Sequence, residues 1–130
     1  MMLYVTDTHS LVWYLSEDYR LSVKAKEIFE YVEKGNIAII IPTIVLAELF
    51  YICENKGLLN IFYLIIEKIK EGSSFIAYNL DLNIIVEFKD LLNISEMHDR
   101  IIVATARLLK ADVITKDEEI EDSGYVKTVW

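Results

Sequence analysis

The sequence predicts an α/β fold, with a parallel sheet of five strands covered by helices on both faces. Short apolar runs alternate along the chain with longer segments whose apolar residues recur at helical spacing. The run at residues 37–41 is β-branched except for one alanine, which is typical of a strand buried on both faces. Strands that alternate with helices form parallel sheets, because each helix returns the chain to the start of the next strand.

The elements can be placed in chain order. Expected strands cover residues 2–6, 37–41, 75–79 and 125–129, with one more from Asp112 to just before Asp117. Expected helices cover residues 8–16, 23–34, 44–53, 58–71, 82–92 and 99–111, with one helical turn at 118–122. Ser22 and Asp81 are favoured N-caps. The chain shows no linker or internal repeat, so we expect one domain over residues 1–130.

Composition narrows the class of protein. Apolar residues make up 54% of the chain, which is too many for extensive disorder. Cys53 is the one cysteine, so no disulfide forms within the chain and a reducing cytoplasm is the expected setting. We find no signal peptide pattern. The most apolar stretch, residues 37–53, is interrupted by Pro42 and Glu48, so no membrane span is expected.

The charge balance argues against one mode of nucleic-acid binding. The chain has 13 basic and 21 acidic residues, for a net charge of -8. A protein this acidic does not bind nucleic acid through bulk positive charge. Carboxylates gathered around divalent cations are offset once the metal binds, so a nuclease remains open. An acidic surface also suits a basic protein partner.

Four acidic residues lie where a ligand site is expected in such a sheet. Asp7 directly follows the first strand, and Asp117 follows the strand that starts at Asp112. Glu48 is the only charge among ten residues of helix 44–53, about one turn from its start, and Asp99 opens another helix. Ligands bind parallel sheets outside the carboxyl ends of the strands. We therefore expect these four carboxylates to meet at one edge.

Each acid alone has a simpler interpretation. Asp7 is a favoured N-cap for the helix that follows it, and Glu48 is accounted for if its helix exposes one narrow polar edge. Together, four carboxylates without a cation would repel by about 1–4 kcal/mol per close pair. Mg²⁺ or Mn²⁺ relieves that repulsion and suits oxygen ligands. Such ions activate water and stabilise the leaving oxygen in phosphodiester cleavage, and the hydroxyls of Thr8 and Thr115 lie beside the acids in sequence.

Several motifs of the sequence resemble those of a known protein family. Residues 7–13, Asp-Thr-His-Ser-Leu-Val-Trp, resemble the opening motif of PIN-domain proteins, especially VapC-like toxins of toxin–antitoxin systems. Residues 98–106 resemble the motif around the family's third acid, and residues 114–117 the motif around its fourth. Glu48 fits the helix of the second acid. The resemblance follows the whole chain in order and spacing.

The resemblance implies a metal-dependent endoribonuclease with a Rossmann-like PIN fold. It assigns Asp7, Glu48, Asp99 and Asp117 to a Mg²⁺ or Mn²⁺ site, with Thr115 assisting. It also implies an RNA substrate, a homodimer, and a cognate antitoxin that blocks the site. These statements are expectations carried by the likeness, and the spacing of the acids alone does not establish them.

Other interpretations stay open at this stage. An RNA-processing nuclease that is not a toxin, and a PIN module that binds nucleic acid or a partner without cleavage, share the same motifs. A receiver-like signalling domain needs a phospho-accepting aspartate after a central strand, and Pro42 and Asn79 end the second and third strands instead. Lys116, Arg100 and Arg107 are candidate phosphate contacts, although surface charge is the commoner role for each.

Overall fold

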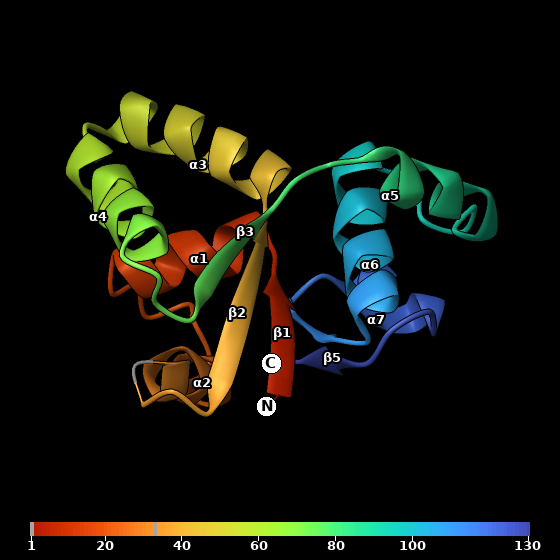
Figure 1. Ribbon diagram of the computed structural model, residues 1–130, viewed down its shortest axis with the longest axis horizontal. Coiled ribbons are helices and arrows are strands. Elements are labelled where there is room, and N and C mark those ends of the chain that lie inside the picture. Colours follow the sequence, from red (N-terminus) through yellow and green to blue (C-terminus); the bar gives the residue numbers. More distant parts are fainter. Residues whose placement is uncertain (1, 33) are drawn as a thin grey trace.

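The computed structural model describes residues 2–32 and 34–130 and shows the predicted α/β architecture (Figure 1). Its five strands are β1 (Met2–Thr6), β2 (Ile37–Pro42), β3 (Phe75–Tyr78), β4 (Asp112–Ile114) and β5 (Thr128–Val129). The α-helices within the described residues are α1 (Thr8–Leu15), α2 (Val23–Val32), α3 (Thr43–Lys56), α4 (Leu59–Lys70), α5 (Leu82–Val86), α6 (Met97–Leu109) and α7 (Glu118–Ser123). A 3₁₀ helix, η1, covers Glu87–Asp90.

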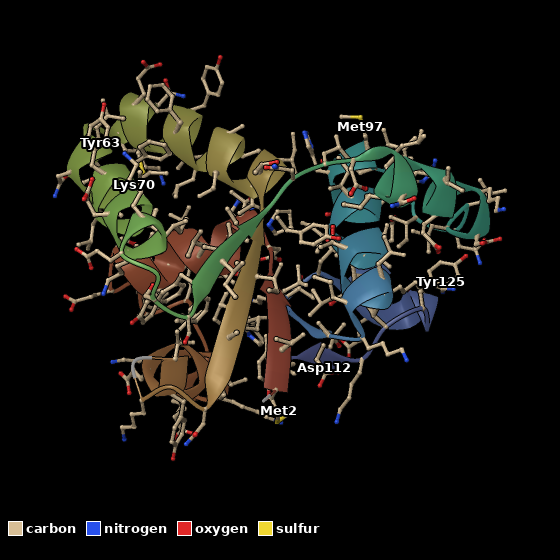
Figure 2. The ribbon with its side chains drawn as sticks, in the orientation of Figure 1. Met2, Tyr63, Lys70, Met97, Asp112 and Tyr125 are labelled. Atoms are coloured by element: carbon tan, nitrogen blue, oxygen red, sulfur yellow. The ribbon has the colours of Figure 1, made fainter. Side chains whose placement is uncertain are left out.

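The sheet is parallel throughout, with strand order β3-β2-β1-β4-β5. Figure 1 shows α1 to α4 on one side of the strands and α5 to α7 on the other. The central strand β1 pairs with β2 and with β4, so the direction in which strands are added reverses between β1 and β4. Met2 marks the start of β1, and Met97 lies toward the opposite end of the molecule (Figure 2). The predicted fold class is confirmed.

Two clusters of buried apolar side chains hold the layers together. The main cluster packs β1, β2 and β4 against α1 to α4, and Val5, Ile39 and Leu49 are fully buried within it. The second joins α5, α6 and α7 through residues such as Ile84 and Ile120. The strand at residues 37–42 is buried along nearly its whole length, as its β-branched composition predicts.

The predicted helix at residues 82–92 is a mixed element. It is α-helical only as far as Val86 and then tightens into η1. Leu91 and Ile94, which follow η1, are both buried. The N–H of Leu91 donates to the carbonyl of Phe88, and that of Ile94 to the carbonyl of Leu91. Leu92 is exposed, although a regular helix over 82–92 is expected to bury it with its other apolar residues.

Other element boundaries also differ from the prediction. The last strand begins at Thr128 rather than 125, because Tyr125 and Val126 pack on the second core cluster before the chain reaches β4. Helix α6 begins at Met97, which places Asp99 within its first turn. In α4 the fully buried residue is Ile65, and Tyr63 is exposed. Glu33, near the predicted end of the second helix, lies outside the described residues.

The described helices include none that is long and apolar enough to cross a membrane.

Gly57 ends α3 in a left-handed conformation, with φ of 68°. Leu58 donates its N–H to the carbonyl of Cys53, which closes the helix end. We predict that Gly57→Ala lowers the free energy of unfolding by about 1 kcal/mol, because a Cβ disfavours positive φ. Urea denaturation measures this, with the exposed helical variant Asn55→Ala as control. Equal stabilities of Gly57→Ala and wild type would contradict the assignment.

Candidate metal-binding site

The candidate site lies at the carboxyl ends of β1 and β4, where the strand order reverses. Thr6 pairs with Ile114, and the N–H of Asp7 donates to the Ile114 carbonyl across 3.3 Å. The residues that follow the two strands are therefore neighbours although they are far apart in sequence. This is the crevice at which open parallel sheets bind ligands.

Thr115 joins two of the acids. It is only 3% exposed. Its hydroxyl donates to Asp7 Oδ2 across 2.6 Å, and its oxygen accepts the N–H of Asp117 across 3.0 Å. A buried hydroxyl with both bonds made holds its partners in one arrangement. Thr115 thus orients the carboxylate of Asp7 and the backbone of Asp117.

Asp7 and Asp117 are N-caps as well as members of the site. Asp7 Oδ1 accepts the N–H of Ser10 across 2.9 Å at the start of α1. Asp117 Oδ1 accepts the N–H of Ile120 across 3.0 Å at the start of α7. Capping and site membership are therefore compatible, since the cap fixes each carboxylate at the sheet edge. The simpler interpretation of Asp7 is correct and does not remove it from the site.

Glu48 finds the polar partner that its apolar helix lacks. The buried hydroxyl of Thr8 donates to Glu48 Oε1 across 2.8 Å. His98 Nδ1 lies 3.9 Å from Glu48 Oε2. The Glu48 side chain is 31% exposed, so it lies at the rim of the core rather than within it. Figure 1 shows α3 and α6 both beginning near the same ends of the strands, which brings Glu48 and His98 together.

Asp99 has the most perturbed environment of the four acids. Its pKa is raised from 3.8 to about 7. The largest cause is burial, followed by the negative charge of Asp117 and then by the charges of Glu96, Asp7 and Glu119. Burial and neighbouring carboxylates both disfavour the charged form of Asp99. A divalent cation between these carboxylates would reverse that preference.

The four predicted acids line one cleft of about 470 Å³, together with His98 and Lys116. Within residues 2–32 and 34–130, no three acidic, histidine or cysteine side chains are grouped tightly enough to hold an ion as they stand. Mg²⁺ does not require such a cage, because it keeps several waters and takes one or two carboxylates directly. The donor set is all oxygen and strongly anionic, which fits Mg²⁺ or Mn²⁺.

Only one of the three candidate phosphate contacts lines this cleft. Lys116 is there, between Thr115 and Asp117 in sequence. Arg100 instead donates from Nε to the carbonyl of Ile94, which fixes the loop before α6. Arg107 lies 4.0 Å from Glu87 and over the ring of Tyr125. Both arginines therefore have structural partners.

The cleft also contains Glu96 and Trp13, to which the sequence analysis assigned no role. Glu96 lines it and lies 3.2 Å from His98 Nδ1. Trp13 lines it from the helix that Asp7 caps, one turn beyond His9. The spacing of four between His9 and Trp13 was the available signal, because residues one turn apart share a helix face. For Glu96 the indication in the sequence was weaker, namely that an acidic residue precedes the helix that carries Asp99.

Comparison with known proteins places the chain in a family. The PIN domain model matches residues 4–124. No curated protein matches the chain. A chain of VapBC2 from Rickettsia felis, solved bound to a promoter DNA fragment, is 20% identical with a TM-score of 0.75, and 98% of each chain is covered.

Two further solved structures give the same result. A toxin–antitoxin complex from Klebsiella pneumoniae is 19% identical with a TM-score of 0.71, covering 100% of this chain and 97% of that one. DNA-bound VapBC from Salmonella typhimurium is 17% identical with a TM-score of 0.69, covering 99% and 98%. Identities this low establish likeness of fold alone. Because the family model spans most of the sequence, the chain belongs to the PIN domain family.

Proposed function

We propose that this PIN domain is a metal-dependent endoribonuclease that acts as the toxin of a toxin–antitoxin pair. PIN domains are nucleases, and the convergence of Asp7, Glu48, Asp99 and Asp117 on one cleft is the observation that carries the proposal. The pKa of Asp99, raised by burial and then by neighbouring carboxylates, supports it, because ionising such a group is costly without a cation. The toxin role is supported by the likeness to VapBC structures.

The chain's own residues have distinct parts in the proposed mechanism. Mg²⁺ or Mn²⁺, when bound, would supply positive charge at the scissile phosphodiester and activate the attacking water. The four carboxylates would hold the ion. Thr115 keeps Asp7 in place and Thr8 keeps Glu48 in place through their hydroxyl hydrogen bonds. Lys116, on the wall of the cleft, offers a cation to the phosphate backbone of the RNA.

We further propose a cognate antitoxin and a homodimer as partners. The net charge of -8 and the acidic cleft favour a blocking segment that is basic. The hairpin of α3 and α4 exposes aromatic residues, with Tyr51 66% and Tyr63 56% exposed. Exposed apolar groups clustered in this way support a protein contact there. The one cysteine, Cys53, is buried and free, which suits action in the cytoplasm.

Metal removal tests the nuclease proposal. We predict that the purified protein cleaves RNA with Mg²⁺ or Mn²⁺ and that excess EDTA abolishes cleavage until metal is restored. Asp7→Asn is expected to lower the cleavage rate at least about 100-fold, because it removes a ligand and the acceptor of the Thr115 hydroxyl. Asp90→Asn, an exposed acid on η1, is the matched control.

Gel-resolved cleavage of a mixed set of RNAs measures this rate. Wild-type protein that is folded, free of antitoxin and inactive on every RNA with both metals would overturn the nuclease proposal. The toxin role has its own test, which is induced expression in a bacterial host. Growth arrest by the wild type and not by Asp7→Asn is expected. Cleavage in vitro without growth arrest would favour an RNA-processing enzyme.

A further inference from the structure

A row of aromatic rings leads out of the acidic cleft. His9, exposed and on the cleft wall, faces Trp13 one turn along α1, with ring centroids 5.7 Å apart and planes at 46°. Trp13 is held in turn by Trp130, edge-on at 5.8 Å, and by the guanidinium of Arg20, 5.0 Å from the ring centroid. Figure 1 shows α1 leaving the end of β1, so the row begins beside Asp7.

The inner part of this row is fixed and the outer part is open. Trp13 packs against the main core cluster and Trp130 does the same, so neither ring is free to move away. His9 is the exposed end, and among residues 2–32 and 34–130 its ring contacts only the ring of Trp13. A planar side chain that is supported from behind and open toward a cleft is suited to stacking with another flat group.

Because the cleft is acidic, a stacking contact would contribute to its affinity for RNA. The walls carry the four site acids together with Glu96 and Glu118, and Lys116 is the lysine there. Release of counterions, the usual source of nucleic-acid affinity, needs clusters of lysine and arginine at the phosphates. Stacking of bases on aromatic rings does not depend on positive charge and tolerates any sequence. A cleft this acidic therefore has more to gain from contacts with bases than from further contacts with phosphates.

We propose that His9, supported by Trp13, stacks with a nucleobase of the RNA beside the scissile phosphate. The inference rests on the proposed ribonuclease function and adds a residue that positions the substrate in that same cleft. Bases within a duplex are covered above and below by their neighbours, so His9 has access only to a base in a single strand, loop or bulge. His9 is in this account a positioning residue that binds the substrate, and it takes no part in proton transfer.

Intrinsic fluorescence reports directly on this contact. The chain has two tryptophans, so in a Trp130→Phe background Trp13 is the sole indole fluorophore. Adding Asp99→Asn to that background allows binding to be followed without cleavage. We expect a mixed-sequence single-stranded octaribonucleotide to quench Trp13 fluorescence, and the blunt duplex of the same sequence to leave it unchanged. Binding of both forms with equal affinity would overturn the inference.

Two substitutions of His9 separate stacking from acid–base chemistry. His9→Ala is expected to weaken binding of the octaribonucleotide roughly 5- to 150-fold, the range that loss of one stacked base gives. His9→Phe keeps a stacking ring and should bind within about 3-fold of wild type. Tyr51→Ala, an exposed aromatic on α3 outside the cleft, is the matched control and should bind like wild type.

Cleavage kinetics complete the test on the otherwise wild-type chain. We expect His9→Ala to raise KM for single-stranded RNA and to leave kcat within about 3-fold, the pattern for lost substrate binding. His9→Phe as defective as His9→Ala would show that the imidazole does chemistry and would overturn the inference. An unchanged KM in His9→Ala would do the same. Both results require an active wild type, so they are distinct from failure of the ribonuclease proposal, in which the wild type cleaves no RNA.

Discussion

Asp99→Asn is expected to abolish metal-dependent cleavage and, in the absence of metal, to make the protein more stable. The carboxyl of Asp99 has a pKa of about 7 because it is buried and surrounded by other acids, so its charged form is unfavourable in the fold. A shift from 3.8 to about 7 corresponds to roughly 4 kcal/mol. Solvent screening of this partly exposed group reduces that figure, and we expect about 1–2 kcal/mol.

The sign of this effect depends on pH. The pKa of Asp99 is higher in the folded state than in the unfolded state, so protonation favours folding. Well below pH 4 the group is neutral in both states and the asparagine gives no advantage. As pH rises through 7, the folded wild-type protein acquires the unfavourable charge. The stabilisation by Asp99→Asn is therefore largest at pH 8 and disappears toward pH 4.

Urea denaturation in EDTA at pH 8 and pH 4.5 measures this difference. Asp90→Asn is the control, because it removes one exposed negative charge elsewhere and should change stability little at either pH. Mg²⁺ or Mn²⁺ at millimolar concentration should stabilise the wild type at pH 8 and have little effect on Asp99→Asn. If Asp99→Asn proves less stable than wild type in EDTA at pH 8, Asp99 is not under the electrostatic strain described here.

Thr115→Val is the second substitution with a large expected effect. Valine has nearly the same shape but lacks the hydroxyl that donates to Asp7 and accepts from the Asp117 N–H. Because the position is buried, the N–H loses its partner without access to water, and we expect a loss of about 1–3 kcal/mol in stability. Misplacing Asp7 should lower the cleavage rate about 10- to 100-fold.

Two further variants test whether loss of the Thr115 hydroxyl causes the lower cleavage rate. Thr115→Ser retains the hydroxyl and should restore most of the activity. Thr105→Val removes another buried threonine hydroxyl, one that bonds only within α6 to the carbonyl of Ile101, and should leave the cleavage rate near that of wild type. Unfolding curves and single-turnover cleavage rates provide the measurements. Full activity of Thr115→Val would mean that the orientation of Asp7 by Thr115 is unimportant.

Local sequence patterns predict most of the fold because they depend on short-range chemistry. The alternation of strands and helices, the buried run at residues 37–42 and the capping role of Asp81 can all be recognised from neighbouring residues. The helix predicted at 82–92 was wrong in its second half, where the chain forms η1 over Glu87–Asp90 and is no longer helical from Leu91. Leu91 and Ile94 are buried in the second core cluster with residues of α6 and α7, and the local pattern does not contain that packing.

The sequence predicts which acids line the candidate site but not the contacts that hold them in place. Asp7 and Asp117 stand out because each follows a strand, but their proximity depends on β1 and β4 being neighbours. Strand order is a property of the whole sheet and has no local signal in either strand. The Thr115 to Asp7 bond spans 108 positions in the chain, and the row from His9 to Trp130 spans nearly all of it. Such contacts emerge only when the elements pack.

Calorimetric titration of the metal-free protein with Mn²⁺ at pH 7.5 tests most directly whether the four acids form one metal site. We expect saturable binding to the wild type and to Asp90→Asn, and an affinity at least about 10-fold weaker for each of Asp7→Asn, Glu48→Gln, Asp99→Asn and Asp117→Asn. Absence of binding to the folded wild type, or wild-type affinity in all four single variants, would contradict the account.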